Sequence, residues 1–479
     1  MNVSIILYIL GWILNFEAAF MTLPCIVALI YGEAQIWSFV VTMVICLVIG
    51  IPLVIKSPDS KAFYTKEGFL TVALSWIVLS LMGALPFMFS GSIPNFVDAI
   101  FETVSGFTTT GASILSDVES LSHCILFWRS FTHWIGGMGV LVFILSLLPL
   151  TGGYHMSLMK AESPGPSVSK LVPRVRSTAK ILYGIYLALT LIEILFLLAG
   201  KMPLFDALTT AFGTAGTGGF GIKNNSMAGY SMYLQNVVTI FMILFGVNFN
   251  VYFFILMKKY TQAFKCEELR YYLGIIAGAI IIITINIRGL FPTLGKAIQQ
   301  AAFQVGSIIT TTGFATTDFN TWPEVSKTIL VMLMFVGACA GSTGGGIKVS
   351  RFVILLKTIK KEIGSYIHPQ SVKKINMDGK PIEHEVVRSV NVFMITYIIL
   401  FSFSVLLMGF DNLDLITNFT AVAATLNNIG PGLELVGPSQ NFGVFTDTSK
   451  WILIFDMLAG RLEIFPLLLL FTPDSWRRF

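Results

Sequence analysis

Four stretches of similar composition decide how this chain folds: FVDAIFETVSGFTTTGAS at 96–113, LFDALTTAFGTAGTGGFG at 204–221, AIQQAAFQVGSIITTTGFAT at 297–316 and LITNFTAVAATLNNIGPGL at 415–433. Each begins with about three helical turns of small and apolar residues and then breaks at a cluster of Thr or Asn with Gly. The clusters end at four glycines that lie 108, 94 and 117 residues apart: Gly111, Gly219, Gly313 and Gly430. Such self-similarity predicts a structural unit repeated four times.

The composition around these stretches excludes a soluble globular protein. Of the 479 residues, 55% are hydrophobic and 12% are charged, whereas soluble domains are about 45–50% apolar and about 25% charged. The mean hydropathy is +0.79. Apolar runs of about 20 residues recur along the chain, and this is the length that a helix needs to cross a bilayer. We therefore predict a polytopic, all-α membrane protein.

Ten segments are apolar enough to span as helices: 3–30, 35–55, 69–89, 124–150, 181–199, 233–257, 272–287, 328–356, 390–410 and 450–471. The first has no basic n-region or small-residue cleavage site, so we expect it to be retained as a span. Most of the 31 lysines and arginines lie in linkers that fall on one side if the spans alternate. The positive-inside rule predicts that this side, with both chain termini, is cytoplasmic.

The spans and the four stretches together predict two leading transmembrane helices and four repeats of helix, pore loop and helix around a central ion pathway. The expected divisions are a leading helix pair over 1–60, pore repeat 1 over 61–160, pore repeat 2 over 161–262, pore repeat 3 over 263–365, a cytoplasmic linker over 366–385 and pore repeat 4 over 386–479.

The Thr/Asn and Gly clusters suggest a cation filter. Non-helical backbone at membrane depth is tolerated where it lines a cavity, and a ring of carbonyl groups can replace the hydration shell of a monovalent cation. Glycine also lets such loops approach closely. An ordinary turn is the alternative for any single loop. The predicted filter residues, with a K⁺ ion as the bound metal, are Thr109, Thr110, Gly111, Thr217, Gly218, Gly219, Thr311, Thr312, Gly313, Asn427, Asn428, Ile429 and Gly430.

A run of ten small residues, GACAGSTGGG at 337–346, interrupts an apolar segment. We predict a movable intramembrane gating loop, and close helix packing is the alternative. Arg461 lies in the apolar run of the fourth repeat, where it can present a barrier to cations below the filter; an ion pair with Glu463 or Asp456 is the alternative. The predicted gate residues are Gly337, Gly341, Gly344, Gly345, Gly346 and Arg461.

Several other features leave alternatives open or exclude a function. The roles of four residues stay open: Arg129, His133, Glu17 and Glu193. The five cysteines have no metal-ligand spacing and predict neither a disulfide framework nor a zinc site. GSTGGGIK at 341–348 fails as a phosphate-binding loop, because Lys does not follow the last glycine. Enzymatic activity, cofactors and nucleic-acid binding are not expected, and the remaining alternative is a secondary solute carrier coupled to Na⁺ or H⁺.

Six separated motifs carry a family resemblance: SGFTTTGAS, GTGGFG, TTTGFATTDFN, NNIGPGL, WRSFTHWIGGMG and GRLEIFPLLLLF. These motifs occur along the chain in the order typical of the Trk/Ktr/HKT superfamily of potassium-translocating proteins, which the chain resembles, and within that superfamily it is most similar to the TrkH type. The resemblance covers nearly the whole chain.

The resemblance implies channel-like potassium uptake across the cytoplasmic (inner) membrane. It implies that the four glycines of the clusters select K⁺ over Na⁺, that 337–346 is the gating loop, and that Arg461 is the arginine below the filter. It also implies a homodimer that binds a cytosolic, nucleotide-binding regulatory subunit of the TrkA type. One departure is the second loop, which reads GTGG at 216–219 where the other loops carry Thr or Asn before Gly, so its side chains can add little coordination and backbone carbonyls must suffice there.

Overall fold

The computed structural model describes residues 2–56, 64–137, 139, 175–370 and 374–476, and the protein is mostly helical, as predicted. The predicted continuation of the span 124–150 past Gly139, and the part of the basic linker over 160–174, lie outside the described residues. In the first half of the chain the helices are α1 (Val3–Phe20), α2 (Thr22–Tyr31), α3 (Ile36–Ile55), α4 (Thr65–Phe89), α5 (Phe96–Phe107), α6 (His123–Gly137), α9 (Val175–Ala199) and α10 (Leu204–Gly216).

The second half continues with helices and one small hairpin. Its elements are α11 (Met232–Phe245), α12 (Phe249–Leu256), α13 (Tyr260–Lys265), α14 (Glu267–Ile287), α15 (Leu294–Ile309), α16 (Glu324–Phe335), α17 (Val349–Ile367), β1 (Asn376–Met377), β2 (Lys380–Pro381), α18 (His384–Met408), α19 (Leu415–Leu426), α20 (Asp447–Arg461) and α21 (Phe465–Leu470). The hairpin of β1 and β2 lies in the segment that we expected to be a plain cytoplasmic linker.

Six helical segments among the described residues are long and apolar enough to cross a membrane: Val3–Tyr31, Ile36–Ile55, Thr65–Phe89, Lys180–Ala199, Glu267–Leu290 and His384–Asp411. A seventh is the pair α11 and α12 if the two are one span. The membrane-spanning character predicted from hydropathy is therefore confirmed.

Two of the predicted spans are broken at places where the sequence predicted no interruption, and the prediction was wrong there. The span 233–257 is bent by 90° between α11 and α12, where the Asn248 side chain caps α12 by accepting a hydrogen bond from the Asn250 amide at 2.9 Å. The span 450–471 breaks after Arg461, because Glu463 and Ile464 have φ angles of 55° and 69° that no right-handed helix contains.

The small-residue run 337–346 is not helical, as predicted. α16 ends at Phe335 and α17 begins at Val349. The two ends of the run meet, since Val336 pairs with Ile347 in a short parallel bridge and the Gly337 amide donates to the Ile347 carbonyl at 2.8 Å. The alternative of a packed helix contact is therefore wrong.

Four short helices enter the molecule just ahead of the Thr/Asn and Gly clusters: α5, α10, α15 and α19. Three of them start at a side-chain cap, with Asn95, Thr293 and Asp414 accepting hydrogen bonds from amides of the first turn. Each helix then runs, buried on most sides, to the start of its cluster. A short helix of small and apolar residues therefore carries each cluster into the interior of the protein.

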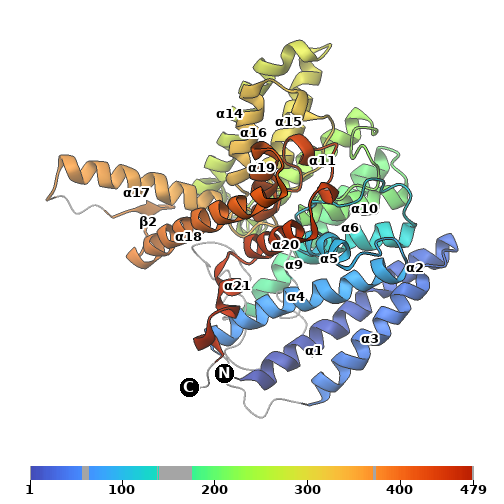
Figure 1. Ribbon diagram of the computed structural model, residues 1–479. Coiled ribbons are helices and arrows are strands. Elements are labelled where there is room, and N and C mark those ends of the chain that lie inside the picture. The colour runs from blue at the N-terminus through green and yellow to red at the C-terminus, as the bar shows by residue number, and fades with distance from the viewer. Residues whose placement is uncertain (1, 57–63, 138, 140–174, 371–373, 477–479) are drawn as a thin grey trace.

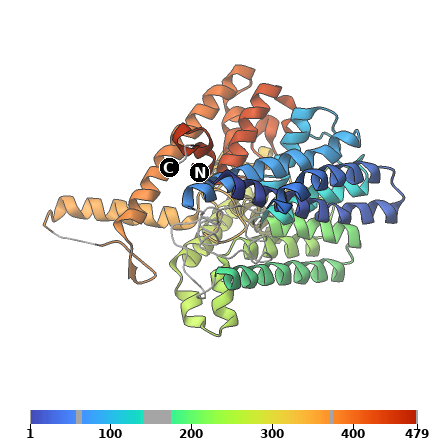
Figure 2. The ribbon, with the colours of Figure 1, turned by 90° about the horizontal axis from the view of Figure 1, so that it is seen from below.

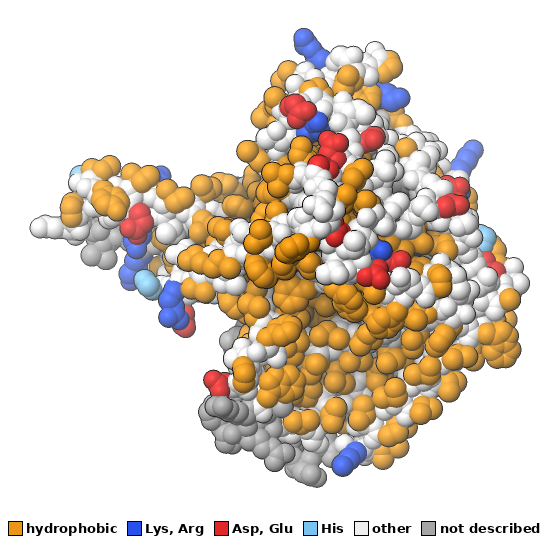
Figure 3. All heavy atoms as spheres, in the orientation of Figure 1, with side chains coloured by type: hydrophobic (Ala, Val, Ile, Leu, Met, Phe, Trp, Pro, Cys, Tyr) orange, Lys and Arg blue, Asp and Glu red, His pale blue; other side chains and the backbone are white. Residues whose placement is uncertain are grey.

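The helices pack in one body with a projecting arm (Figure 1). α1 and α3 lie side by side and pack on α4, and α17 extends away from the other helices (Figures 1 and 2). The first and last described segments lie on the same side of the molecule, where the Lys66 ammonium donates to the Asp474 carbonyl at 2.8 Å. A broad apolar surface covers the face formed by α1, α3 and α4, as in Figure 3, and on α3 it includes exposed Trp37, Val44 and Val48.

Candidate functional site

The four clusters fold into the same turn. Two residues before each terminal glycine, a residue other than glycine adopts a positive φ: Thr109 at 56°, Thr217 at 55°, Thr311 at 59° and Asn428 at 54°. The glycines also have positive φ: Gly111 at 78°, Gly219 at 74°, Gly313 at 85° and Gly430 at 100°. Non-glycine residues rarely adopt this conformation, and they persist in it where the surrounding structure compensates for its cost. Four repetitions of it indicate one backbone design used four times.

Hydrogen bonds close the four turns in the same way. The amide of the residue before each glycine donates to the carbonyl five residues earlier, at 2.8 to 2.9 Å: Thr110 to Ser105, Gly218 to Gly213, Thr312 to Ser307 and Ile429 to Ala424. This is the bond pattern that ends a helix in a left-handed turn. It satisfies carbonyls of the last helical turn and leaves the carbonyls of the turn itself free to point elsewhere.

The turns follow one another around a closed ring in chain order. Each glycine lies so close to the carbonyl preceding the next glycine that no Cβ atom fits. A Cβ would lie 1.9 Å from the Gly218 oxygen at Gly111, 2.0 Å from the Thr312 oxygen at Gly219, 2.1 Å from the Ile429 oxygen at Gly313 and 2.8 Å from the Thr110 oxygen at Gly430. The last contact returns to the first turn. Only glycine permits this approach, so the ring brings together the predicted filter backbone from all four repeats.

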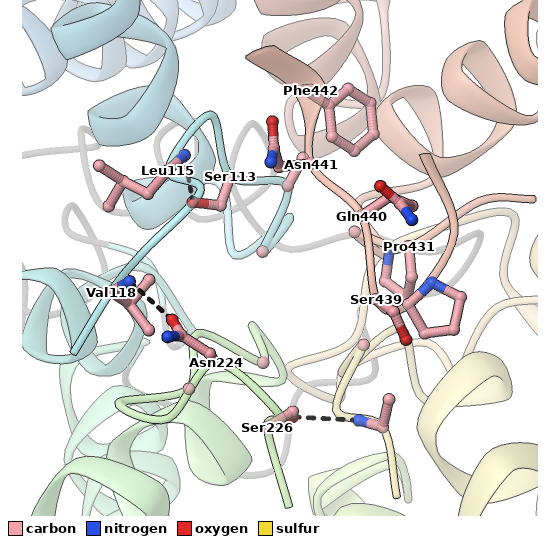
Figure 4. Close-up of a pocket in the computed structure, with 18 of the residues that line it drawn as sticks. Ser113, Leu115, Val118, Asn224, Ser226, Pro431, Ser439, Gln440, Asn441 and Phe442 are labelled. Carbon is pink, nitrogen blue, oxygen red and sulfur yellow. Dashed lines mark hydrogen bonds between the residues drawn. The ribbon is translucent and has the colours of Figure 1, made fainter. Parts of the chain in front are cut away.

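All four ring glycines line one hollow that opens to solvent. Its walls are the segments that follow the glycines, and they carry polar side chains such as Ser113, Asn224, Gln440 and Asn441 (Figure 4). Hydrogen bonds connect neighbouring walls: the Val118 amide donates to the Asn224 side chain at 2.8 Å. We call this hollow the outer vestibule.

Most side chains of the turns are engaged with protein partners. The hydroxyls of Thr108 and Thr110 lie 2.8 Å apart, and those of Thr310 and Thr312 do the same. Asn427 accepts a hydrogen bond from the Tyr397 hydroxyl at 3.0 Å. Backbone carbonyls therefore make up most of the oxygens that remain for a cation.

Two buried polar atoms of the turns have no hydrogen-bond partner among the described residues: Thr109 Oγ1 and Asn428 Oδ1. A buried polar atom without a partner is costly, so these two oxygens stand out among the side chains of the turns. The donor set of the ring, uncharged oxygens only, suits a monovalent cation such as K⁺.

The segment 337–346 lies against the ends of the turns that face away from the outer vestibule. The Gly345 amide donates to Thr311 Oγ1 at 2.6 Å. A Cβ at Gly344 would lie 3.0 Å from the Thr310 oxygen, and one at Gly345 would lie 2.7 Å from the Asn427 oxygen. Two further glycines, Gly341 and Gly346, have positive φ angles of 69° and 67°. The segment therefore reaches directly under the third and fourth turns.

Neighbouring elements hold the segment in this position. The Cys339 amide donates to the Gly246 carbonyl, and the Phe249 amide donates to the Gly341 carbonyl, both at 3.0 Å. The break between α11 and α12 therefore binds one side of the segment. The Glu268 carboxylate accepts from the Ala340 amide at 2.7 Å. The Lys348 ammonium donates to the Gly344 and Gly345 carbonyls. The contacts of Lys348 and Glu268 were not predicted, although a lysine two residues after three successive glycines, at the end of an apolar run, is a signal that the sequence carries.

Arg461 bridges this segment and the first repeat. Its guanidinium donates to the Thr343 carbonyl at 2.9 Å and to the carbonyls of Gly136 and Gly137 at the end of α6. Glu463, which we considered as its partner, instead forms an ion pair with Arg351 at 2.5 Å. Arg461 therefore holds a positive charge beside the segment 337–346.

The residues whose roles the sequence left open fall in two groups. His133 contacts the second turn, and Arg129 reaches the backbone just after it. Glu17 is buried against α4, with its carboxylate 3.2 Å from where a Cβ on Gly83 would lie, and Glu193 is buried beside Thr214 of α10.

Arg129 forms a buried ion pair with Glu102 of α5 at 2.6 Å, and both side chains are at most 3% exposed. Glu102 also accepts from the Ser113 hydroxyl and the Ile114 amide at 2.9 and 3.0 Å. Arg129 reaches the second repeat, where it donates to the Gly221 carbonyl at 2.8 Å. The pair joins the backbone just outside the first turn to the backbone just outside the second.

Glu102→Ala is expected to destabilise the protein by about 3–5 kcal/mol, because it leaves the buried Arg129 charge without its partner. A thermal melt of the detergent-solubilised protein measures the effect. Glu324→Ala is the matched control, since the Glu324 carboxylate pairs with Lys327 but is 86% exposed, and exposed pairs contribute about 0–1 kcal/mol. Equal melting shifts for the two variants would contradict the structural role of the Glu102 pair.

Comparison with known proteins gives consistent matches over the whole chain. A family model described as "TrkH: Cation transport protein" matches residues 35–478. The chain is 38% identical to the Trk system potassium uptake protein TrkH of Salmonella typhimurium, over 100% of both chains, and 34% identical to TrkG of Escherichia coli K12, over 99% of both. The crystal structure of the potassium transporter TrkH from Vibrio parahaemolyticus superposes with a TM-score of 0.89 at 34% identity, covering 100% of both chains.

Proposed function

Because the chain belongs to the TrkH family of cation transport proteins, we propose that it takes up potassium ions across the cytoplasmic membrane through a pore lined by the four glycine turns. Proteins of this family are transporters rather than enzymes. They need no cofactor, and the potassium ion is the transported substrate. The chain is a membrane-embedded transporter, and its relatives are named for potassium uptake.

The observation that carries the proposal is the closed ring of four turns. In it the carbonyls of Thr110, Gly218, Thr312 and Ile429 each lie against the glycine of the preceding turn. A K⁺ ion entering from the outer vestibule loses water and gains carbonyl oxygens in its place. The C-terminal ends of α5, α10, α15 and α19 approach the same ring, and their partial negative charge favours a cation there. Membrane potential then drives the ion inward.

The gate that we propose is the segment 337–346 together with Arg461. The segment lies under the third and fourth turns, and the Arg461 charge beside it repels a cation leaving the ring. Ion passage then requires the segment to move away from Thr311 and Asn427. Because the segment is hydrogen-bonded to Gly246 and Glu268, we propose that the break between α11 and α12, and the start of α14, move with it.

The partners that we propose follow from the family resemblance. They are a second copy of the chain, forming a homodimer, and a cytosolic nucleotide-binding subunit of the TrkA type that controls the gate. The basic segment 348–388, which includes the projecting α17 and the β1–β2 hairpin, offers a contact surface for the regulatory subunit. In the proposed orientation this surface and both chain termini lie on the cytoplasmic side.

Flux measurements on purified protein in liposomes test the proposal. Under an inside-negative potential the protein is expected to admit Rb⁺, a K⁺ substitute, at a rate at least about tenfold above that of Na⁺, since selective filters discriminate by cation hydration and size. Empty liposomes provide the background. Equal uptake of the two ions, or uptake that depends on an organic solute, would contradict the filter and favour a secondary solute carrier.

A further inference from the structure

The second turn lacks a side chain at a position where the other three have one. Directly before the ring glycine stand Thr110, Thr312 and Ile429 in the first, third and fourth turns, but Gly218 in the second. In the first and third turns the threonine hydroxyl bonds to the hydroxyl at the helix end, at 2.8 Å. The second turn has no such brace, although its Gly218 carbonyl faces Gly111 in the ring.

Backbone conformation does not explain the glycine at position 218. Among the described residues Gly218 is absent from those with positive φ, unlike its neighbours Thr217 and Gly219. The lack of space for a side chain explains the glycine instead. A Cβ at Gly218 would lie 2.3 Å from both Cγ and Nδ1 of the His133 ring, and a Cβ at Gly216 would lie 2.2 Å from the His133 carbonyl oxygen. The imidazole occupies the volume that a side chain at position 218 would fill.

His133 is also bonded on both sides of its ring. Its Nδ1 lies 2.7 Å from the Gly106 carbonyl of α5, and its Nε2 accepts a hydrogen bond from the Phe220 amide at 3.2 Å. A carbonyl only accepts and an amide only donates, so the ring is neutral and carries its proton on Nδ1. The side chain is 0% exposed. His133 therefore ties the second turn to the helix that delivers the first.

We propose that His133 is a positioning residue for ion selectivity, whose imidazole replaces the side chain missing at Gly218 and holds the second turn at its place in the ring. The inference rests on the proposed function. Arg129, one helical turn earlier on α6, supports the same junction by donating to the Gly221 carbonyl. Without His133 the second turn, with three glycines at 216, 218 and 219, has more conformational freedom than the others. Its carbonyl would then no longer exclude the smaller Na⁺.

The test is a double-mutant cycle read as the ratio of Rb⁺ to Na⁺ uptake in liposomes. His133→Ala removes both hydrogen bonds of the ring and is expected to lower the ratio by about tenfold, the scale of about 1.4 kcal/mol that buried hydrogen bonds contribute. Gly218→Ser alone is expected to lower it as well, because the new side chain collides with the imidazole. In the double variant the serine occupies the space that the imidazole leaves, so the ratio is expected to recover above that of either single variant.

His123→Ala is the matched control. His123 lies at the other end of α6, where its ring stacks on Tyr31 and bonds to Glu33, so its loss is expected to leave the ratio unchanged. His133→Gln conserves volume and one of the two hydrogen bonds, and an intermediate ratio is expected. This variant carries the test if His133→Ala does not fold.

The outcomes separate this inference from the proposed function. A parent protein that does not prefer Rb⁺ overturns the proposed function itself. A selective parent whose ratio is unaffected in a folded His133→Ala or His133→Gln variant overturns the role of His133. Additive losses in the double variant overturn the exchange of space between His133 and Gly218.

Discussion

Gly111→Ser is expected to reduce the preference for Rb⁺ over Na⁺ by at least about tenfold, which corresponds to about 1.4 kcal/mol of discrimination. Two physical effects act together. At φ 78° a residue with a Cβ is strained, at a cost of about 1–3 kcal/mol. The Cβ would also lie 1.9 Å from the Gly218 oxygen, so the second turn must move outward. The widened ring then coordinates a dehydrated K⁺ less well and discriminates less against Na⁺. Uptake of both ions into liposomes measures the ratio.

Gly91→Ser separates the two effects. Gly91 has a φ of 72°, close to that of Gly111, but a Cβ there would meet nothing within 4 Å. This variant introduces the same backbone strain but does not change the ring, so it is expected to retain the ratio of Rb⁺ to Na⁺ uptake of the parent protein. If Gly91→Ser changed selectivity as much as Gly111→Ser, the close packing of the turns would not be the source of selectivity.

Arg461→Gln is expected to raise Rb⁺ uptake several-fold in the absence of any cytosolic partner, while the ratio of Rb⁺ to Na⁺ stays near that of the parent. The substitution removes the positive charge beside the segment 337–346 and weakens its bridge from Thr343 to the end of α6. Both changes favour passage, because the electrostatic barrier falls and the segment is released. Selectivity is expected to stay the same because the four turns keep their contacts with one another.

Arg388→Gln is the matched control. Arg388 lies on α18 with a side chain that is 71% exposed, and its loss is expected to leave uptake unchanged. A fall in uptake for Arg461→Gln in well-folded protein would show that Arg461 supports the open pathway rather than the closed one. A lower selectivity with the same uptake would instead place Arg461 in the structure of the filter.

The residues that form the turns could be predicted from the sequence. A run of small apolar residues, a cap and a Thr/Asn and Gly cluster are local signals, and the four glycines and the residues two before them all adopt the special φ angles. The interruption at 337–346 was equally local, because three successive glycines do not hold a helix. Hydropathy located the long spans because burial in lipid depends on composition and length.

Other features depended on partners far away in the chain. The breaks at 246–248 and 462–464 lie in apolar runs that composition alone predicted as continuous, and contacts such as that of Gly246 with Cys339 stabilise the bent form. The pairing of Glu463 with Arg351, rather than with Arg461, required knowing which helices meet.

From the amino acids alone one could predict a membrane protein with four glycine turns, because hydropathy, capping and glycine placement act within one short segment at a time. Only the tertiary structure decided how each turn is held. It set the order of the turns around the ring, the place of the segment 337–346 beneath it and the use of His133 to fill the space at Gly218. These are contacts between segments far apart in the chain, and packing in three dimensions is what selects them.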